Sequence, residues 1–153
     1  MKLQSLTLEL DKIRSRKSEL RDLIDKHEHI ILLGNGGSNA VASHIAQDYT
    51  KMLGKRAINF SDPSRLTCYI NDYGRDQAYV EFLKDFADKE TLVILISSSG
   101  NSMNVFNCAV YCKSLNISML LLSGFDKNNK LNSFKGGKFK YCVDSYDYGV
   151  VES

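Results

Sequence analysis

The amino-acid sequence predicts a three-layer, doubly wound α/β sandwich with a five-stranded parallel sheet, preceded by a long amino-terminal helix. Five short apolar runs are hydrophobic throughout instead of alternating, which is typical of parallel strands that are buried on both faces. Helical patterns fill the gaps between these runs. Two of the runs end in turns rich in glycine and serine, each followed by a helical pattern. Together these observations favour a parallel sheet with helices on both faces.

Size and charge narrow the class of protein. The chain has 153 residues, which predicts a single domain over 1–153. Its 20 basic and 18 acidic residues are spread along the sequence and give a net charge of +2, so no nucleic-acid surface is indicated. No apolar run is long enough to span a bilayer, and the chain opens on a polar segment in place of a signal peptide. We expect a cytoplasmic protein with no membrane or nucleic-acid partner.

The cysteines fit a reducing compartment. All four lie inside or beside apolar segments without Cys-x-x-Cys spacing, and we interpret them as small core residues: Cys68, Cys108, Cys112 and Cys142. A metal or redox role for Cys108 and Cys112, which share a helix face, is the weaker alternative.

The first 27 residues predict one amphipathic helix. Its apolar stripe recurs in steps of three and four, is interrupted only by Lys17, and consists of Leu3, Leu6, Leu10, Ile13, Leu20 and Ile24. Such a stripe before the first strand is typical of packing against another helix or subunit, so we expect 1–27 to be an oligomerisation helix. The alternative is that the helix packs on its own sheet.

The remaining elements follow in order. Strand-like runs lie at 30–33, 57–60, 92–96, 118–122 and 140–143. Helical patterns lie at 39–53, 64–70, 76–87, 102–115 and 130–134. Ligands of such folds bind outside the carboxyl ends of the strands, where the strand order reverses.

Two turns at strand ends are suited to phosphate. Residues 34–38 (GNGGS) and 97–102 (SSSGNS) each precede a helical pattern, so backbone N–H groups and serine hydroxyls should point outward at the positive end of a helix dipole. The third glycine of a dinucleotide fingerprint would fall on Asn39, and no lysine stands where a P-loop needs one. Neutral donors in this number favour a phosphomonoester. The alternative for either turn alone is a polar loop with a capping serine.

Three further side chains are candidate catalytic groups. His44 and Asp48 lie four residues apart and so project from one helix face. They could be two metal ligands, or a ligand and a general base, and the alternative is a solvated pair. Asp72 is either a catalytic residue or a turn residue.

These motifs together resemble the sugar isomerase (SIS) domain family, and within it the phosphoheptose isomerases. The resemblance rests on GNGGS at 34–38 followed by His44, NDYG at 71–74, SSSGNS at 97–102 and DYG at 147–149. It implies a flavodoxin-like SIS fold and an aldose–ketose isomerase that converts sedoheptulose 7-phosphate to D-glycero-D-manno-heptose 7-phosphate for lipopolysaccharide or capsule. It also implies a homotetramer with sites at subunit borders. The alternatives are a non-catalytic SIS module, which binds a sugar phosphate or a protein such as a replication initiator, and, more distantly, a nucleotide-binding Rossmann protein.

The resemblance also implies roles for single residues. The phosphate would be held by Ser38, Ser97, Ser99 and Ser102, with Asn35 and Ser98 near the sugar. Glu152 stands where the family has an Asp that supports the site. The whole implied substrate-binding set is Asn35, Gly36, Ser38, Asp72, Ser97, Ser98, Ser99, Ser102 and Glu152.

Catalysis in the family removes a proton beside the carbonyl and passes through a cis-enediol. A Glu is the base, and zinc is held by that Glu, a helix His, and a Gln and His from the last helix. His44 matches the helix His, and Asp48 stands at the Glu position with a side chain one methylene shorter. The resemblance thus implies catalytic roles for His44, Asp48 and Asp72, and zinc ligation by His44 and Asp48. Since the family's last helix lies beyond residue 153, we expect an incomplete catalytic set, either in a truncated chain or in a protein without these groups.

Overall fold

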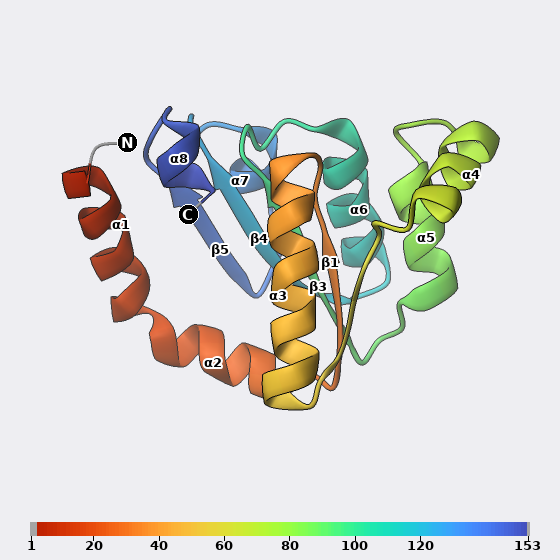
Figure 1. Ribbon diagram of the computed structural model, residues 1–153, viewed down its shortest axis with the longest axis horizontal. Helices are drawn as coiled ribbons and strands as arrows, with labels where there is room; N and C mark the ends of the chain where they lie inside the picture. The colour runs from red at the N-terminus through yellow and green to blue at the C-terminus, as the bar shows by residue number, and fades with distance from the viewer. Residues whose placement is uncertain (1–2, 153) are drawn as a thin grey trace.

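Five parallel strands form one sheet between two layers of helices (Figure 1). This computed structural model describes residues 3–152; Met1, Lys2 and Ser153, which the predicted ranges include, lie outside the described residues. Each neighbouring pair of strands is parallel, in the order β2-β1-β3-β4-β5. The strands are β1 (His29–Leu33), β2 (Arg56–Asn59), β3 (Thr91–Ser97), β4 (Ser118–Gly124) and β5 (Phe139–Val143). The predicted three-layer α/β sandwich with a five-stranded parallel sheet is confirmed.

Successive side chains of the central strands point to opposite faces, and each face has its own apolar core. Ile31 and Leu33 join the core beneath one helical layer, whereas Ile30 and Leu32 join the other. Figure 1 shows α3 in front of the sheet and α6 behind it. One layer contains α4 (Pro63–Tyr73), α5 (Ala78–Phe86), α6 (Met103–Ser114) and α7 (Lys130–Ser133). The other contains α2 (Lys17–Asp25) and α3 (Gly37–Leu53).

The predicted long amino-terminal helix is divided into α1 (Leu3–Ser15) and α2. The break falls at Arg16, whose guanidinium donates to the Lys140 carbonyl of β5 over 2.7 Å and stacks 4.0 Å from the centre of the Phe139 ring. After this turn α2 packs on the sheet, where Ile24 is buried and Leu20 is half-buried. The second half of the stripe therefore packs on the sheet of its own chain, which is the alternative to packing against another helix or subunit.

The cysteine interpretation holds for two of the four thiols. Cys108 and Cys112 are fully buried in the core beneath α6, and burial raises the pKa of both, that of Cys112 to about 12. The interpretation is wrong for Cys68, which is exposed, because α4 buries none of its side chains completely. Cys142, on the edge strand β5, is partly exposed. Within residues 3–152 there is no helix with the length and apolar character to cross a membrane.

The strand order places the two glycine- and serine-rich turns side by side. From β1 the chain moves to β2 on one side and then to β3 on the other, so the order reverses between β1 and β3. Leu33, at the end of β1, pairs with Leu95 near the end of β3. This is the switch point at which ligands of doubly wound sheets bind.

Candidate functional site

A cleft of about 200 Å3 lies at the switch point, between the two turns. Seven of the residues predicted to bind substrate line it: Asn35, Ser38, Ser97, Ser98, Ser99, Ser102 and Glu152. Gly37 and Tyr148 complete its wall. Gly36 does not line the cleft, and its position before α3 with a φ of +53° is one that favours glycine.

The serine hydroxyls of the cleft contact one another. The hydroxyl oxygens of Ser38 and Ser98 lie 3.2 Å apart, so the first turn touches the second across the switch point. The Ser97 hydroxyl donates to that of Ser102 over 3.3 Å. A hydroxyl has one donor and two acceptor sites, so these contacts leave bonding capacity for a ligand. The hydroxyls of the two turns therefore form one connected array of neutral donors.

Neither turn is an ordinary serine cap. Ser102 occupies the residue before α6, yet its side chain makes no capping hydrogen bond and contacts Ser97 instead. Gly36, before α3, has no side chain with which to cap that helix. Helix starts without a capping residue leave backbone N–H groups for a ligand, although in α6 the Val105 N–H donates to the Asn104 side chain. This geometry favours an anion site over a polar loop with a capping serine.

Two glycines of the first turn make room for close packing. A Cβ on Gly34 would lie 2.7 Å from the backbone carbonyl carbon of Ser38, so only glycine allows the turn to fold back on the start of α3. A Cβ on Gly37 would lie 2.5 Å from a carboxylate oxygen of Glu152. Gly34 thus allows the backbone of the turn to lie against the start of α3, and Gly37 leaves space for the Glu152 side chain.

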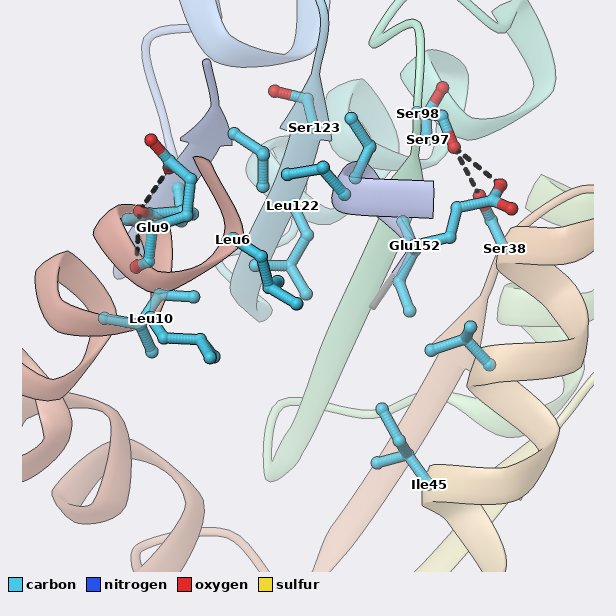
Figure 2. A pocket seen from close by; sticks show the side chains of 17 residues that line it. Leu6, Glu9, Leu10, Ser38, Ile45, Ser97, Ser98, Leu122, Ser123 and Glu152 are labelled. Carbon is cyan, nitrogen blue, oxygen red and sulfur yellow. Dashed lines mark hydrogen bonds between the residues drawn. The ribbon is translucent and has the colours of Figure 1, made fainter. Parts of the chain in front are cut away.

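Glu152 brings a carboxylate into the cleft. It follows the short helix α8 (Tyr148–Val151), which begins where Asp147 accepts the Gly149 N–H over 2.8 Å. The Ser98 hydroxyl donates to Glu152 over 2.9 Å, and Figure 2 shows the side chain pointing toward Ser38 and Ser98. The predicted place of Glu152 beside the two turns therefore agrees with the geometry.

An apolar cavity of about 220 Å3 adjoins the cleft and shares Ser38, Ser97, Ser98 and Glu152 with it. As Figure 2 shows, Leu6 and Leu10 of α1 face Ile45 of α3 across this cavity. Glu9 is buried at its rim, where it accepts hydrogen bonds from Lys12 and from the Tyr141 hydroxyl, the latter over 2.7 Å. Burial raises the pKa of Glu9, but these bonds outweigh it, so the pKa lies below its ordinary value.

His44 and Asp48 are close to each other but do not line the cleft. The Nε2 atom of His44 lies 3.5 Å from a carboxylate oxygen of Asp48, and the side chains are 77% and 48% exposed. The buried face of α3 runs through Ser38, Ala42 and Ala46, which turns His44 toward solvent. Imidazole and carboxylate are zinc ligands, yet no group of three His, Cys, Asp or Glu side chains in the described part of the chain could hold a metal. Within the described residues, this pair therefore has no third ligand of these types beside it.

Asp72 also lies outside the cleft, near the end of α4, where it is exposed. It accepts a hydrogen bond from the Asn71 amide over 3.0 Å and one from the Cys68 thiol. The Asp72 carboxylate raises the pKa of that thiol. Its predicted catalytic and substrate-binding roles stay predictions, as do those of His44 and Asp48.

Sequence reasoning did not single out Tyr79 and Asn104, which lie behind the cleft. The Tyr79 hydroxyl donates to the Gly34 carbonyl over 2.7 Å, and burial raises the pKa of Tyr79 to about 12. Asn104 exchanges two hydrogen bonds with Asn35. Both side chains are at least 95% buried. The sequence does contain one indication for Asn104. It is a polar residue on the same face of the predicted helix at 102–115 as Cys108 and Cys112, which were interpreted as core residues.

Known proteins are similar to this chain in sequence and fold. The SIS domain family matches residues 3–124. The chain is 32% identical to the phosphoheptose isomerase of Fusobacterium nucleatum over 131 residues, which are 82% of this chain and 63% of that protein. It is 35% identical to that of Helicobacter pylori (strain P12), over 82% of this chain and 64% of the relative. The chain thus spans less than two thirds of the length of these relatives.

The structure of phosphoheptose isomerase GmhA from Neisseria gonorrhoeae superposes with a TM-score of 0.88 at 22% identity, covering 98% of this chain and 84% of that one. This likeness shows that the two chains share a fold. Because the family match spans more than half of the sequence, the chain belongs to the SIS domain family.

Proposed function

We propose that this chain binds sedoheptulose 7-phosphate in the cleft and acts as an aldose–ketose isomerase that forms D-glycero-D-manno-heptose 7-phosphate for lipopolysaccharide or capsule. The observation that carries the proposal is the contact between the two hydroxyl-rich turns, Ser38 to Ser98 and Ser97 to Ser102, at the switch point. The similarity to phosphoheptose isomerases at 32% and 35% identity supports this substrate.

In the proposed complex, the phosphate accepts hydrogen bonds from Ser38, Ser97, Ser99 and Ser102. Hydrogen bonds from neutral donors to a charged phosphate are strong, and the uncapped starts of α3 and α6 add favourable dipoles. The sugar then extends toward Asn35, Ser98 and Glu152, which line the rest of the cleft. The proposal therefore gives the phosphate and the sugar separate groups of residues.

Isomerisation moves a proton from C1 of the ketose to C2 through a cis-enediol, so it needs a base and a donor to the two oxygens. We assign the base to Asp48, with His44 beside it and Asp72 as a further substrate-binding and catalytic group. The pair lies on the exposed face of α3, so it is free to serve the site of a neighbouring subunit. We accordingly propose a cytoplasmic homotetramer with sites at subunit borders, in which the half-exposed stripe of α1 joins the subunits.

Zinc enters this proposal only through His44 and Asp48. They would be two of its ligands, and two side chains do not complete the tetrahedral set of a zinc site. We therefore derive no step through the metal from this chain. Zinc analysis of the purified protein and of a His44→Ala variant tests the assignment, and equal zinc content in both would remove His44 from it.

Calorimetry with sedoheptulose 7-phosphate tests the proposed site. Replacing Ser97 by alanine removes a hydrogen bond to a charged group, worth ~1.5–3 kcal/mol, so the affinity should fall about 10- to 100-fold. Ser114→Ala is the matched control, since this exposed hydroxyl of α6 donates to the Tyr111 carbonyl far along the helix from Ser102. Unchanged binding by Ser97→Ala, or no binding by the unaltered protein, would refute the site.

The second candidate function is sugar-phosphate binding without turnover. The observation that favours it is the exposure of His44 and Asp48 outside the cleft. NMR detection of the aldose product separates the two functions. Turnover that is lost in Asp48→Ala supports the isomerase, whereas tight binding without turnover, with and without added zinc, supports the binding module.

A further inference from the structure

A buried pair of amides lies directly behind the cleft, where Asn104 of α6 faces Asn35 of the first turn. We infer that Asn104 is a positioning residue, which fixes the direction of the Asn35 amide so that Asn35 can only donate a hydrogen bond to the ligand. This inference rests on the proposed function for the identity of the ligand, but the orientation of the amide can be tested without any ligand.

The backbone of α6 fixes the orientation of Asn104. The N–H of Val105 donates to Oδ1 of Asn104 over 3.0 Å. A backbone N–H can only donate, so the side-chain oxygen of Asn104 must face it and the side-chain nitrogen must point the other way. Asn104 is 5% exposed, so no solvent is at hand to satisfy a reversed amide.

Asn104 in turn fixes Asn35. Nδ2 of Asn104 donates to Oδ1 of Asn35 over 2.8 Å, and Nδ2 of Asn35 donates back to Oδ1 of Asn104 over 3.0 Å. The Tyr79 hydroxyl, which donates to the Gly34 carbonyl, also lies 3.1 Å from Oδ1 of Asn35. A reversed Asn35 amide would set buried N–H groups against each other, which is unfavourable.

The hydrogen bonds of Asn35 decide what it can offer to the cleft. Its oxygen accepts from Asn104 and lies 3.1 Å from the Tyr79 hydroxyl, whose single proton is shared between this oxygen and the Gly34 carbonyl. One of its two N–H groups is used by Asn104. The second N–H remains, and Asn35 lines the cleft. Asn35 therefore binds a ligand oxygen that accepts a hydrogen bond, such as a carbonyl or enediolate oxygen. It does not accept a hydrogen bond from a ligand hydroxyl.

Hydrogen exchange of the Asn35 side-chain amide tests this inference in the full chain. In 15N-labelled protein, one Asn35 N–H should be protected, and in Asn104→Ala its exchange should become at least about tenfold faster. Asn107→Ala is the matched control, because this asparagine lies on the same helix but donates to the Asp76 carbonyl, so it should leave the signal unchanged. Asn104→Leu is the second variant, because it keeps a side chain of similar size but has neither the acceptor nor the donor that contact Asn35. It should show the same faster exchange, so the test does not depend on whether the alanine variant folds.

A double-mutant cycle with sedoheptulose 7-phosphate tests whether Asn104 acts through Asn35. Asn35→Ala and Asn104→Ala should each weaken binding by about tenfold, and the double variant should bind no more weakly than Asn35→Ala alone. Additive losses, or unchanged exchange of the Asn35 amide in both Asn104 variants, would overturn the inference. If the unaltered protein does not bind this sugar phosphate, the proposed function fails, whereas the exchange measurement still decides the role of Asn104.

Discussion

Replacing Gly34 by alanine tests whether the first turn depends on the close approach of two backbone segments. The added Cβ would lie 2.7 Å from the carbonyl carbon of Ser38 and 2.8 Å from its carbonyl oxygen. Both atoms belong to the backbone of the first turn of α3, so neither can rotate away as a side chain does. The start of α3 must therefore move by several tenths of an ångström, and the Ser38 hydroxyl must move with it.

The size of the effect follows from the kind of clash. Extra atoms forced against well-packed backbone cost ~1–3 kcal/mol. For a chain of 153 residues, each kcal/mol lowers the melting temperature by about 2–4 °C, so Gly34→Ala should melt ~2–12 °C below the unaltered protein. Displacement of Ser38 from its 3.2 Å contact with Ser98 should also weaken binding of sedoheptulose 7-phosphate by about tenfold.

Gly37→Ala is the matched control on the same turn. Its Cβ would meet the carboxylate of Glu152, which is the far end of a flexible side chain that can swing aside. Its melting temperature should therefore stay within about 2 °C of the unaltered protein, as for substitutions without a backbone clash. Scanning calorimetry of the two variants side by side is the measurement. Equal melting temperatures for Gly34→Ala and Gly37→Ala would show that the turn does not need this close approach.

Two carboxylates give the remaining predictions. Glu152→Gln removes a negative charge beside Ser98, so calorimetric affinity for inorganic phosphate should rise by up to about tenfold, and an unchanged or weaker affinity would contradict the repulsion. Glu9 has a pKa below its ordinary value of 4.5, so its contribution to stability is complete above about pH 4.5 and is lost as the pH falls through the lower pKa of the folded state. Melting temperatures of Glu9→Gln should accordingly fall less steeply than those of the unaltered protein below pH 4.5, and parallel curves would show that Glu9 does not titrate differently on folding.

The features that the sequence predicts well are those with local causes. The strand at 92–96 extends by only one residue at each end in the structure, because a strand buried on both faces is apolar along its whole length. The two turns can be recognised in the sequence because each combines glycine with serine in a short segment directly after a strand. Asp48 shows the limit of prediction from local pattern. Helical spacing places it on the same helix face as His44, but it does not determine whether that face lines the cleft or is exposed to solvent.

Features with distant causes could not be predicted from local pattern. The break at Arg16 depends on a carbonyl 124 residues away, and the orientation of Asn35 depends on Asn104, 69 residues away. From the sequence, Tyr79 is predicted only as a core residue of a helix. In the structure its hydroxyl donates to the Gly34 carbonyl, 45 residues away along the chain. The serine hydroxyls of the two turns could thus be predicted from the sequence. The contacts of Asn104 and Tyr79 with the first turn could not.

The contact of Arg16 with Lys140 has a consequence for self-association. β5 is an outer strand of the sheet, and an outer strand presents unpaired carbonyl and N–H groups to which a strand of another molecule can add. Arg16 occupies one of these carbonyls, and its guanidinium lies over the Phe139 ring at the start of the same strand. The junction between the first two helices thereby removes one free acceptor from this border of the sheet, which makes the addition of a further strand at Lys140 less favourable.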